Sequence, residues 1–205
     1  MKTLATLATT LALVLCSTMV RAVEEPKYTV VGQHEGFEVR EYPPYIAAEV
    51  VVPGSAGEAG NQGFRLLAGY IFGRNKGERK IPMTAPVTQA PAPQKIEMTA
   101  PVTQAAAEGG WRVQFVMPAG STMETLPEPL DPQVKLREVP ATRYAVIRYS
   151  GFWTEGNYEE HLQALQRAVD AAGLPVTGPP VYSRYDPPWI PWFMRRNEIW
   201  LRLAS

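Results

Sequence analysis

Phe37-Glu-Val-Arg-Glu-Tyr-Pro43 recurs 97 residues later as Val134-Lys-Leu-Arg-Glu-Val-Pro140, and the correspondence continues beyond the two prolines. Without a gap, Gly54 then aligns with Gly151. Between these landmarks each copy contains a stretch rich in β-branched and aromatic residues, which is typical of strands: residues 46–52 and 143–149. The pattern predicts a duplicated unit in which a strand, a proline turn, a second strand and a glycine follow one another.

A helical segment follows each of these glycines. The first is expected to run from about Ser55 to Phe72 and the second from about Asn157 to Ala172, each ending at a glycine. Asn157 with Glu160 three residues later resembles a capping box. The second segment carries an apolar stripe at helical spacing, made by Tyr158, Leu162, Leu165, Val169 and Ala172. Both halves of the chain therefore predict a helix after their second strand.

Further strands are expected in the remaining sequence, at residues 112–117, 180–184 and 198–203. Strands around two helices in a repeated order indicate the α+β class. An antiparallel sheet with so many short strands is expected to curl into a barrel. The predicted architecture is thus a distorted β-barrel flanked by two helices.

A second repeat lies between the duplicated halves. Lys80-Ile-Pro-Met-Thr-Ala-Pro-Val-Thr-Gln89 returns as Lys95-Ile-Glu-Met-Thr-Ala-Pro-Val-Thr-Gln104, with Pro82 replaced by Glu97. As a strand, each copy places Ile, Met, Ala and Val on one face and the threonines on the other. The prolines favour an edge or bulge position. We interpret the two copies as a hairpin or as two nearby strands.

Length and composition favour one domain preceded by an export signal. A chain of 205 residues with 45% apolar content can bury one sizeable core. Residues 1–22 combine Lys2, an apolar run and the small-residue pattern Val20-Arg21-Ala22, which is typical of a secretory signal peptide. A retained anchor or packed helix is the alternative. We therefore expect residues 23–205 to form a single secreted domain with a net charge of about −2.

Several function classes are disfavoured by composition. Cys16 is the only cysteine and lies in the predicted signal, so disulfides and cysteine metal sites are not expected in the mature chain. His34 and His161 are too few for a histidine metal cluster, and we predict no metal site. The near-neutral charge argues against nucleic-acid binding. No catalytic triad, phosphate-binding glycine loop or paired-carboxylate signature is present, so we expect no enzyme.

At this point the sequence resembles the SOUL haem-binding family. The resemblance rests on both Met-Thr-Ala-Pro-Val copies and on four further segments: Gly73-Arg-Asn-Lys-Gly77, residues 111–118, Tyr185-Asp-Pro-Pro188 and Arg195-Arg-Asn-Glu-Ile-Trp-Leu201. It implies a distorted barrel of two β-α-β-β repeats, similar in fold to bacterial effector-binding domains. It also implies binding of haem or another tetrapyrrole, without an agreed enzymatic activity.

The resemblance transfers the family's ligand contacts only in part. An axial histidine has been proposed at a position that is Glu41 here, and a carboxylate is a weak ligand for haem iron, so no strong axial protein ligand is expected. Of three cations proposed to hold the propionates, Arg65 is retained, whereas the other two positions are Ala68 and Ile190. Arg65 would share a helical face with Ala68, Gly69 and Phe72, where small residues admit a flat macrocycle, and Leu66 is a further expected contact. The alternative is a solvated helix charge.

Residues 189–194 form the most apolar loop of the predicted mature chain. The expected contacts from this region are Trp189, Ile190, Trp192, Phe193, Met194 and Arg195. If exposed, such a patch usually marks a ligand groove or a membrane interface. A loop folded back on its own barrel is the alternative.

The leading functional hypothesis is a secreted, periplasmic haem or tetrapyrrole binding protein that acts as a reversible carrier or buffer. We expect a monomer with a small-molecule partner and peripheral membrane contact as an option. The alternatives are an effector-binding module for another flat apolar molecule, an envelope protein that touches membrane through residues 189–194, and an enzyme acting on tetrapyrroles.

Overall fold

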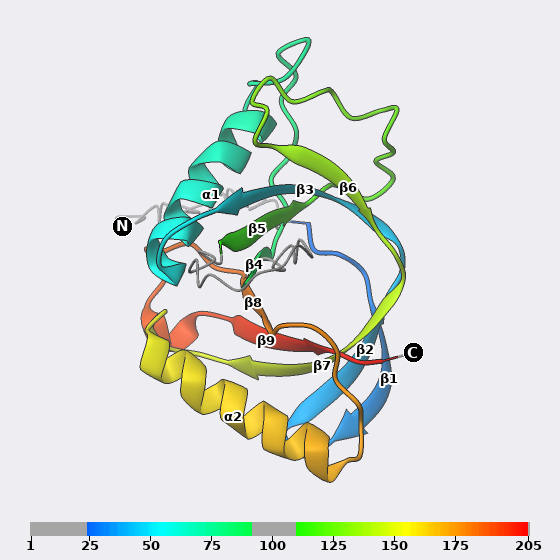
Figure 1. Cartoon of the computed structure of the whole chain (residues 1–205), viewed down its shortest axis with the longest axis vertical. Coiled ribbons are helices and arrows are strands. Elements are labelled where there is room, and N and C mark those ends of the chain that lie inside the picture. The colour runs from blue at the N-terminus through cyan, green and yellow to red at the C-terminus, as the bar shows by residue number, and fades with distance from the viewer. Residues whose placement is uncertain (1–23, 92–109, 205) are drawn as a thin grey trace, which may run out of the picture.

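A computed structural model describes residues 24–91 and 110–204 (Figure 1). Two α-helices, a short 3-10 helix and nine strands follow one another along the described chain. They are β1 (Thr29–His34), β2 (Phe37–Tyr42), β3 (Tyr45–Val52), α1 (Ala56–Ile71), β4 (Val87–Pro91), β5 (Trp111–Val116), β6 (Lys135–Val139), β7 (Thr142–Tyr149), α2 (Glu155–Ala171), β8 (Val181–Arg184), η1 (Trp192–Met194) and β9 (Asn197–Arg202). All expected strands and helices of the two halves are present in the described ranges, whereas β1 and η1 were not predicted.

The strands form one antiparallel sheet in the order β1-β2-β7-β9-β8-β4-β5-β3-β6. Leaving out β1, this order is symmetric about the β8–β4 pair, as a duplicated sequence requires. The first strand of each half pairs with the second strand of the other half, β2 with β7 and β6 with β3. The sheet therefore shows the duplication that the sequence predicts, and the two halves are joined because each pairs its first strand with the second strand of the other.

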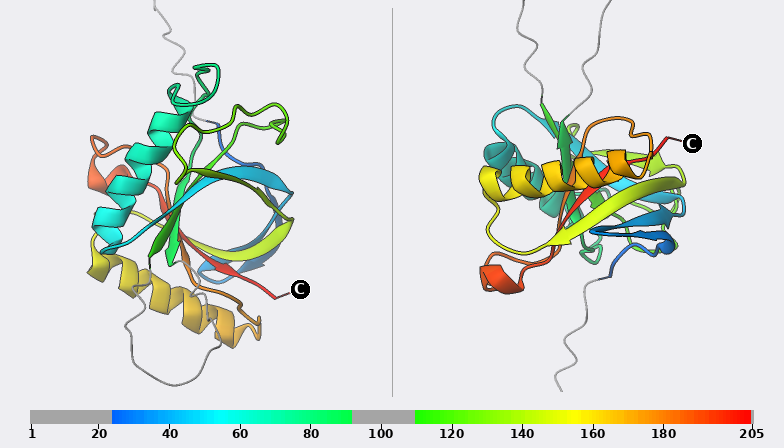
Figure 2. Two further views of the ribbon diagram at one scale, coloured as in Figure 1. Left: turned by 45° about the horizontal axis from the view of Figure 1, so that its top comes forward. Right: turned by 90° about the horizontal axis from the view of Figure 1, so that it is seen from below.

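The sheet is strongly curled but does not close (Figure 2). Strands β1 and β6 are its two ends, and no pairing joins them. The predicted barrel is thus corrected to an open, curled sheet. Closure needs hydrogen bonds between the end strands, and here both ends remain edges.

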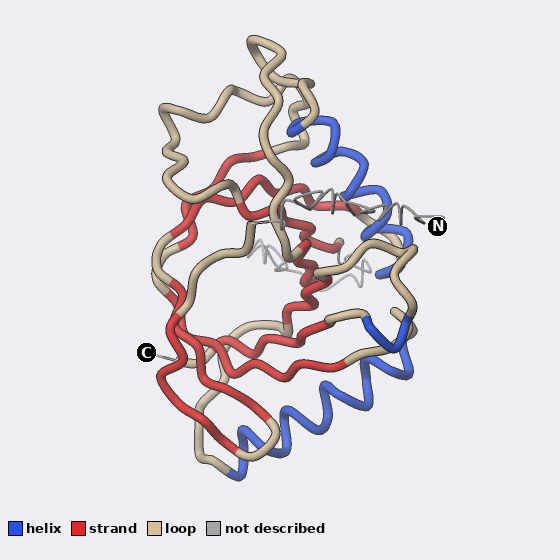
Figure 3. Tube along the Cα trace, turned by 180° about the vertical axis from the view of Figure 1, so that it is seen from behind, coloured by secondary structure: helices blue, strands red, loops and turns tan. Residues whose placement is uncertain are grey.

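Both helices cover the outer face of this sheet (Figures 1 and 3). Helix α1 packs on β3 and β5, and its core includes Leu67, Ile71 and Phe115. Helix α2 packs on β7 and β9 around Leu165 and Ile199. The inner, concave face carries a separate and mainly aromatic cluster made by Tyr42, Tyr144, Val146 and Trp200. Because successive side chains along a strand point to opposite faces of the sheet, neighbouring residues belong to these two clusters in turn.

Local chemistry explains where the helices begin. Ser55 forms a capping box with Glu58 at the start of α1. For α2 the expected cap was wrong: Thr154 is the N-cap, and its hydroxyl accepts a hydrogen bond from the Asn157 backbone N–H at 3.3 Å. The Asn157 side chain instead donates to two carbonyl oxygens of the loop before the helix. Helix α2 therefore begins two residues earlier than predicted.

Close approach of α1 to the sheet depends on Gly63. A Cβ at this position would lie 2.6 Å from side-chain atoms of Val113 on β5, closer than carbon atoms pack. Any larger residue would push the helix away from the strand. This glycine belongs to the core, in contrast to the small residues of the exposed helix face.

The first Met-Thr-Ala-Pro-Val copy is only partly a strand. Strand β4 begins at Val87, whereas residues 80–86 precede it without joining a regular ladder. We expected at least part of this copy at an edge or bulge, with the threonines on a polar face, but β4 lies between β5 and β8, and Thr84 and Thr88 are both buried. The edge position was wrong for β4, because strands on both sides form hydrogen bonds with it. The second copy lies outside the described residues.

The described residues include no helix that combines the length and the apolar character needed to cross a membrane. Residues 1–22, where we predict the signal peptide, are outside the described part of the chain.

Candidate functional site

The loop between β8 and β9 exposes large aromatic side chains. Trp189 is 79% exposed and Met194 is 66% exposed, and Trp192 and Phe193 are also exposed in the short helix η1. Monomeric proteins seldom leave several neighbouring side chains of this size in water without a use. The loop is therefore an outward-facing apolar surface and is not folded back on the sheet.

A second loop, which the sequence patterns did not reveal, adds two more aromatic rings. Phe152 stacks on Trp192 with ring centroids 5.2 Å apart and planes within 9°. The backbone N–H of Gly151 donates to the Trp192 carbonyl oxygen at 2.9 Å, which ties the two loops together. Trp153 is the next residue in the same segment, and its indole N–H donates to the Asn197 side chain at 2.8 Å. Since Gly151 is one of the two repeated glycines, the duplication itself could have pointed to this loop.

Two arginines flank Trp153 at this place. The guanidinium carbons of Arg184 and Arg195 each lie 4.9 Å from a Trp153 ring centroid. Stacking of guanidinium groups on indole rings is a favourable arrangement that leaves N–H donors at the rim. We name this region the aromatic–arginine surface and define it by Phe152, Trp153, Arg184, Trp192, Phe193 and Arg195. It combines flat apolar area with positive charge.

The predicted helix residues lie on α1. Arg65 is exposed, and Phe72 is exposed at the helix end, while Leu66 packs partly against the core beneath α1. Ala68 is half-buried. The space next to Gly69 is taken by Arg74, whose guanidinium atoms would lie 3.3 to 3.4 Å from a Cβ there. A ligand on this face would therefore meet a second cation that the sequence patterns did not identify.

The structure brings the loop residues together around η1, whereas Arg65 lies on a different element, α1. Among residues 24–91 and 110–204 we find no hydrogen bond, ion pair or ring contact between Trp189, Trp192 or Phe193 and the Arg65 face. The link to α1 runs through Arg184, since its Nη1 would lie 3.6 Å from a Cβ at Gly60. The aromatic–arginine surface thus adjoins the first half of α1.

The histidines are engaged elsewhere. His34 stacks on Phe37 with centroids 4.5 Å apart. His161 stacks on Tyr149, and its Nδ1 lies 2.7 Å from the Asn157 carbonyl oxygen, to which it donates. Glu41 lines a polar hollow of about 180 Å³ with Arg143 and Arg202. No group of three or more His, Cys, Asp and Glu side chains suited to a metal ion occurs within the described ranges.

The concave face holds a buried charge network. The Glu198 carboxylate is fully buried and accepts hydrogen bonds from Arg40, Arg196, Tyr185 and Trp200 at 2.7 to 3.1 Å. Burial alone raises the pKa of Glu198, but the two guanidinium groups and the hydrogen bonds outweigh it, so the pKa lies below its ordinary value. Because both carboxylate oxygens are satisfied within the protein, we assign this network to stability.

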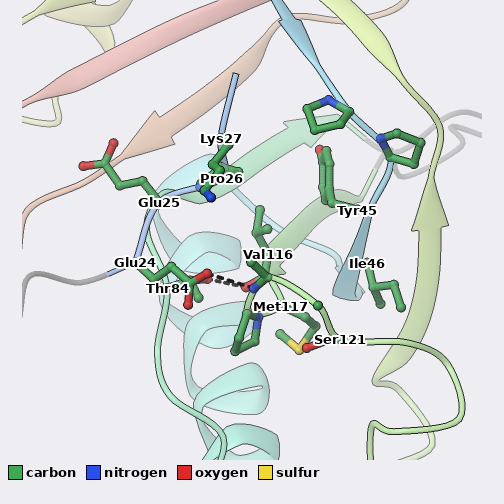
Figure 4. Close-up of a pocket in the computed structure, with 15 residues that line it drawn as sticks. Glu24, Glu25, Pro26, Lys27, Tyr45, Ile46, Thr84, Val116, Met117 and Ser121 are labelled. Atoms are coloured by element: carbon green, nitrogen blue, oxygen red, sulfur yellow. Dashed lines mark hydrogen bonds between the residues drawn. The ribbon is translucent and has the colours of Figure 1, made fainter. Parts of the chain in front are cut away.

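The described structure also has a cavity of about 190 Å³ (Figure 4). It lies between residues 24–27 and the ends of β3 and β5. Glu24 accepts a hydrogen bond from the Ala119 N–H at 2.8 Å, and Glu25 pairs with Arg196 at 2.9 Å, so the N-terminal segment is fixed across the opening. This cavity is small for a macrocycle, whereas the aromatic–arginine surface offers exposed rings beside two cations, and we take that surface as the candidate site.

Comparison with known proteins agrees with this fold. The chain is 27% identical over 187 residues to human Heme-binding protein 2, covering 88% of this chain and 86% of that protein. The isolated EcmrR C-terminal domain superposes with a TM-score of 0.54 at 14% identity, over 87% of this chain and 98% of that one. In a complex of EcmrR with DNA the TM-score is 0.58 at 13% identity, over 82% of this chain but only 56% of that one.

A hydrolase from Listeria innocua is similar at a TM-score of 0.51 and 13% identity, over 90% of this chain and 94% of that chain. These structural likenesses establish an effector-binding-domain type of fold and nothing about activity. The sequence model described as SOUL heme-binding protein matches residues 23–202, nearly the whole chain. The chain therefore belongs to the SOUL heme-binding protein family.

Proposed function

We propose that this protein binds haem or a related tetrapyrrole reversibly at the aromatic–arginine surface. The observation that carries the proposal is the half-exposed stacked pair Phe152–Trp192, which lies next to two guanidinium groups. A porphyrin is flat and apolar and carries carboxylates at one edge, so it matches both features. Membership of the family and the likeness to human Heme-binding protein 2 support the choice of ligand.

The proposed binding does not use a strong axial ligand. His34 and His161 stack on other rings, and neither belongs to the aromatic–arginine surface. Covering about 400 to 600 Å² of macrocycle would contribute roughly 10 to 15 kcal/mol, against association costs of about 4 to 15 kcal/mol. The net is therefore at most about 11 kcal/mol, a Kd no tighter than about 10 nM. Binding of this strength or weaker suits a carrier or buffer better than a permanent cofactor.

The Arg65 face of α1 is the second wall in this proposal. It offers Arg65, Arg74 and the exposed ring of Phe72 on one side of the helix. The expected contacts of the two walls are Arg65, Leu66, Ala68, Gly69 and Phe72 from the helix, and Trp189, Ile190, Trp192, Phe193, Met194 and Arg195 from the loop.

A titration with haem and with metal-free protoporphyrin tests the proposal. Quenching of tryptophan fluorescence should give similar affinities for both, because iron coordination contributes little. Trp192→Ala should weaken both ligands about tenfold through lost contact area. The matched control is Val31→Ala, which removes an exposed apolar side chain on β1. Loss of haem binding alone in a histidine variant would contradict the absence of an axial ligand.

The proposal also includes export of the protein from the cytoplasm. We propose that residues 1–22 are removed and that the mature protein acts as a monomer in the periplasm or outside the cell. Mass spectrometry of the exported protein should find a chain that begins at or near Val23. A full-length or Cys16-lipidated product would contradict it.

Contact with a membrane surface is a second candidate for the same loop. The degree of exposure of Trp189 and Met194 favours it, since such side chains insert at lipid headgroup level. Sedimentation with phosphatidylcholine vesicles, with Trp189→Ala as the test variant, separates the two functions. Retained porphyrin binding with no vesicle binding supports the carrier alone.

A further inference from the structure

Arg184 lies where the aromatic–arginine surface meets α1. It is the last residue of β8, and its guanidinium stacks on Trp153 on one side. On the other side its Nη1 faces Gly60 of α1 and would lie 3.6 Å from a Cβ at that position, an ordinary van der Waals distance. The position is half-buried, so the charge is partly removed from water.

No charge of opposite sign compensates Arg184 within residues 24–91 and 110–204. None of the described ion pairs or side-chain hydrogen bonds includes it. The phenol groups that act on its charge are those of Tyr149 and Tyr182. Burial raises the pKa of both, to about 12 for Tyr149, so both are neutral at physiological pH. Burial also lowers the pKa of Arg184, as expected for a cation without a partner.

Arg195 lies at the same distance from the Trp153 ring as Arg184, but its N–H groups are already hydrogen-bonded. Its Nε donates to the Ile190 carbonyl oxygen at 2.7 Å, and its Nη2 donates to that of Pro188. These bonds hold the loop that carries Trp192. Arg195 is therefore a positioning residue, whereas the N–H donors of Arg184 make no bond to the described part of the chain.

We propose that Arg184 binds a carboxylate of the flat ligand whose ring system lies on Phe152 and Trp192. The inference rests on the proposed function and defines the ligand class more narrowly. The ligand is a planar aromatic molecule with free carboxylates at its edge. A guanidinium fork matches a carboxylate with two parallel hydrogen bonds. A partly desolvated cation without a counter-charge gains more from this pairing than a solvated one. Esterified or carboxylate-free analogues would lose it.

The test compares protoporphyrin IX with its dimethyl ester in the same low detergent concentration. Wild-type protein should prefer the free acid by about 10- to 100-fold, the range expected for a charge-assisted hydrogen-bond pair. Arg184→Gln should abolish this preference by weakening the free acid and should leave the ester within about twofold. Arg167→Gln is the matched control, because it removes the same charge from an exposed position on α2.

Arg184→Lys is a second variant in case Arg184→Gln does not fold. It keeps the positive charge and loses only the forked guanidinium group. Its preference for the free acid should lie between those of wild type and Arg184→Gln. An unchanged ratio of acid to ester affinity in either folded variant overturns the assignment of Arg184 while the proposed function stands. Wild-type protein that binds neither porphyrin overturns the proposed function, and the assignment with it.

Discussion

Glu198→Gln should be among the most destabilising isosteric changes in this protein. The substitution keeps the volume and one acceptor oxygen but removes the negative charge between Arg40 and Arg196. Both guanidinium groups then face each other in a buried site with no anion between them. Removing one partner of a buried ion pair typically costs about 3 to 5 kcal/mol.

The surroundings place the expected loss at the lower end of that range. Arg40 also pairs with Glu38 at 2.8 Å, and Arg196 pairs with Glu25 at 2.9 Å, so neither cation is left entirely alone. We expect a loss of about 3 kcal/mol, a large share of the stability of about 5 to 15 kcal/mol that is typical of a domain. With an m-value of about 2 kcal/mol per molar urea, the unfolding midpoint should fall by about 1.5 M.

Urea unfolding monitored by circular dichroism measures this effect. Glu128→Gln is the control, since it breaks the Lys76–Glu128 pair, whose side chains are 64% and 67% exposed, and should cost less than about 1 kcal/mol. Arg40→Met should cost less in the Glu198→Gln background than in the wild-type protein, because Arg40 has then already lost its fully buried partner and keeps only Glu38. A midpoint shift for Glu198→Gln no larger than that for Glu128→Gln would refute the reasoning.

Three further predictions concern the same charges and rings. The pKa of Glu198 in the folded protein is depressed, so the stability that this carboxylate contributes is present above the ordinary glutamate pKa of 4.5 and is lost as pH falls through the folded value. Below pH 4.5, Glu198→Gln should therefore lose less stability than the wild-type protein. Acid titrations monitored by fluorescence measure this difference. Arg65→Ala should weaken free-acid protoporphyrin by about 1 kcal/mol or less, because Arg65 is solvated, and a loss as large as that for Arg184→Gln would move the carboxylate to α1. His34→Ala and His161→Ala should each leave the haem absorbance shift in place, and its disappearance in a folded variant would reveal an axial ligand.

Most of the fold was predictable because it rests on local patterns. The repeat beginning at Phe37 and Val134 predicted two strand–strand–helix units, and the sheet places them symmetrically. Helix α1 matched its expected bounds since Ser55 provides a local cap. The start of α2 was misplaced because Thr154 and Asn157 are both capable caps, and only the path of the preceding loop decides between them.

Strand partners could not be predicted from the same patterns. The periodicity of residues 80–91 does not distinguish an edge strand from a central one, and β4 proved to be central because strands from both halves flank it. Closure of the sheet likewise depends on whether β1 and β6 meet, which involves residues about a hundred positions apart. Such pairings arise from the collective curl of the sheet and have no local signature.

The candidate site shows the same division. The sequence alone determined that residues 189–194 are apolar and that residues 23–202 match the SOUL heme-binding protein family. Only the tertiary structure decided that Phe152 stacks on Trp192 and that Arg184 stacks on Trp153 without a counter-ion in the described ranges. Composition and periodicity record what each residue prefers locally, whereas exposure and charge compensation depend on neighbours that are distant in sequence.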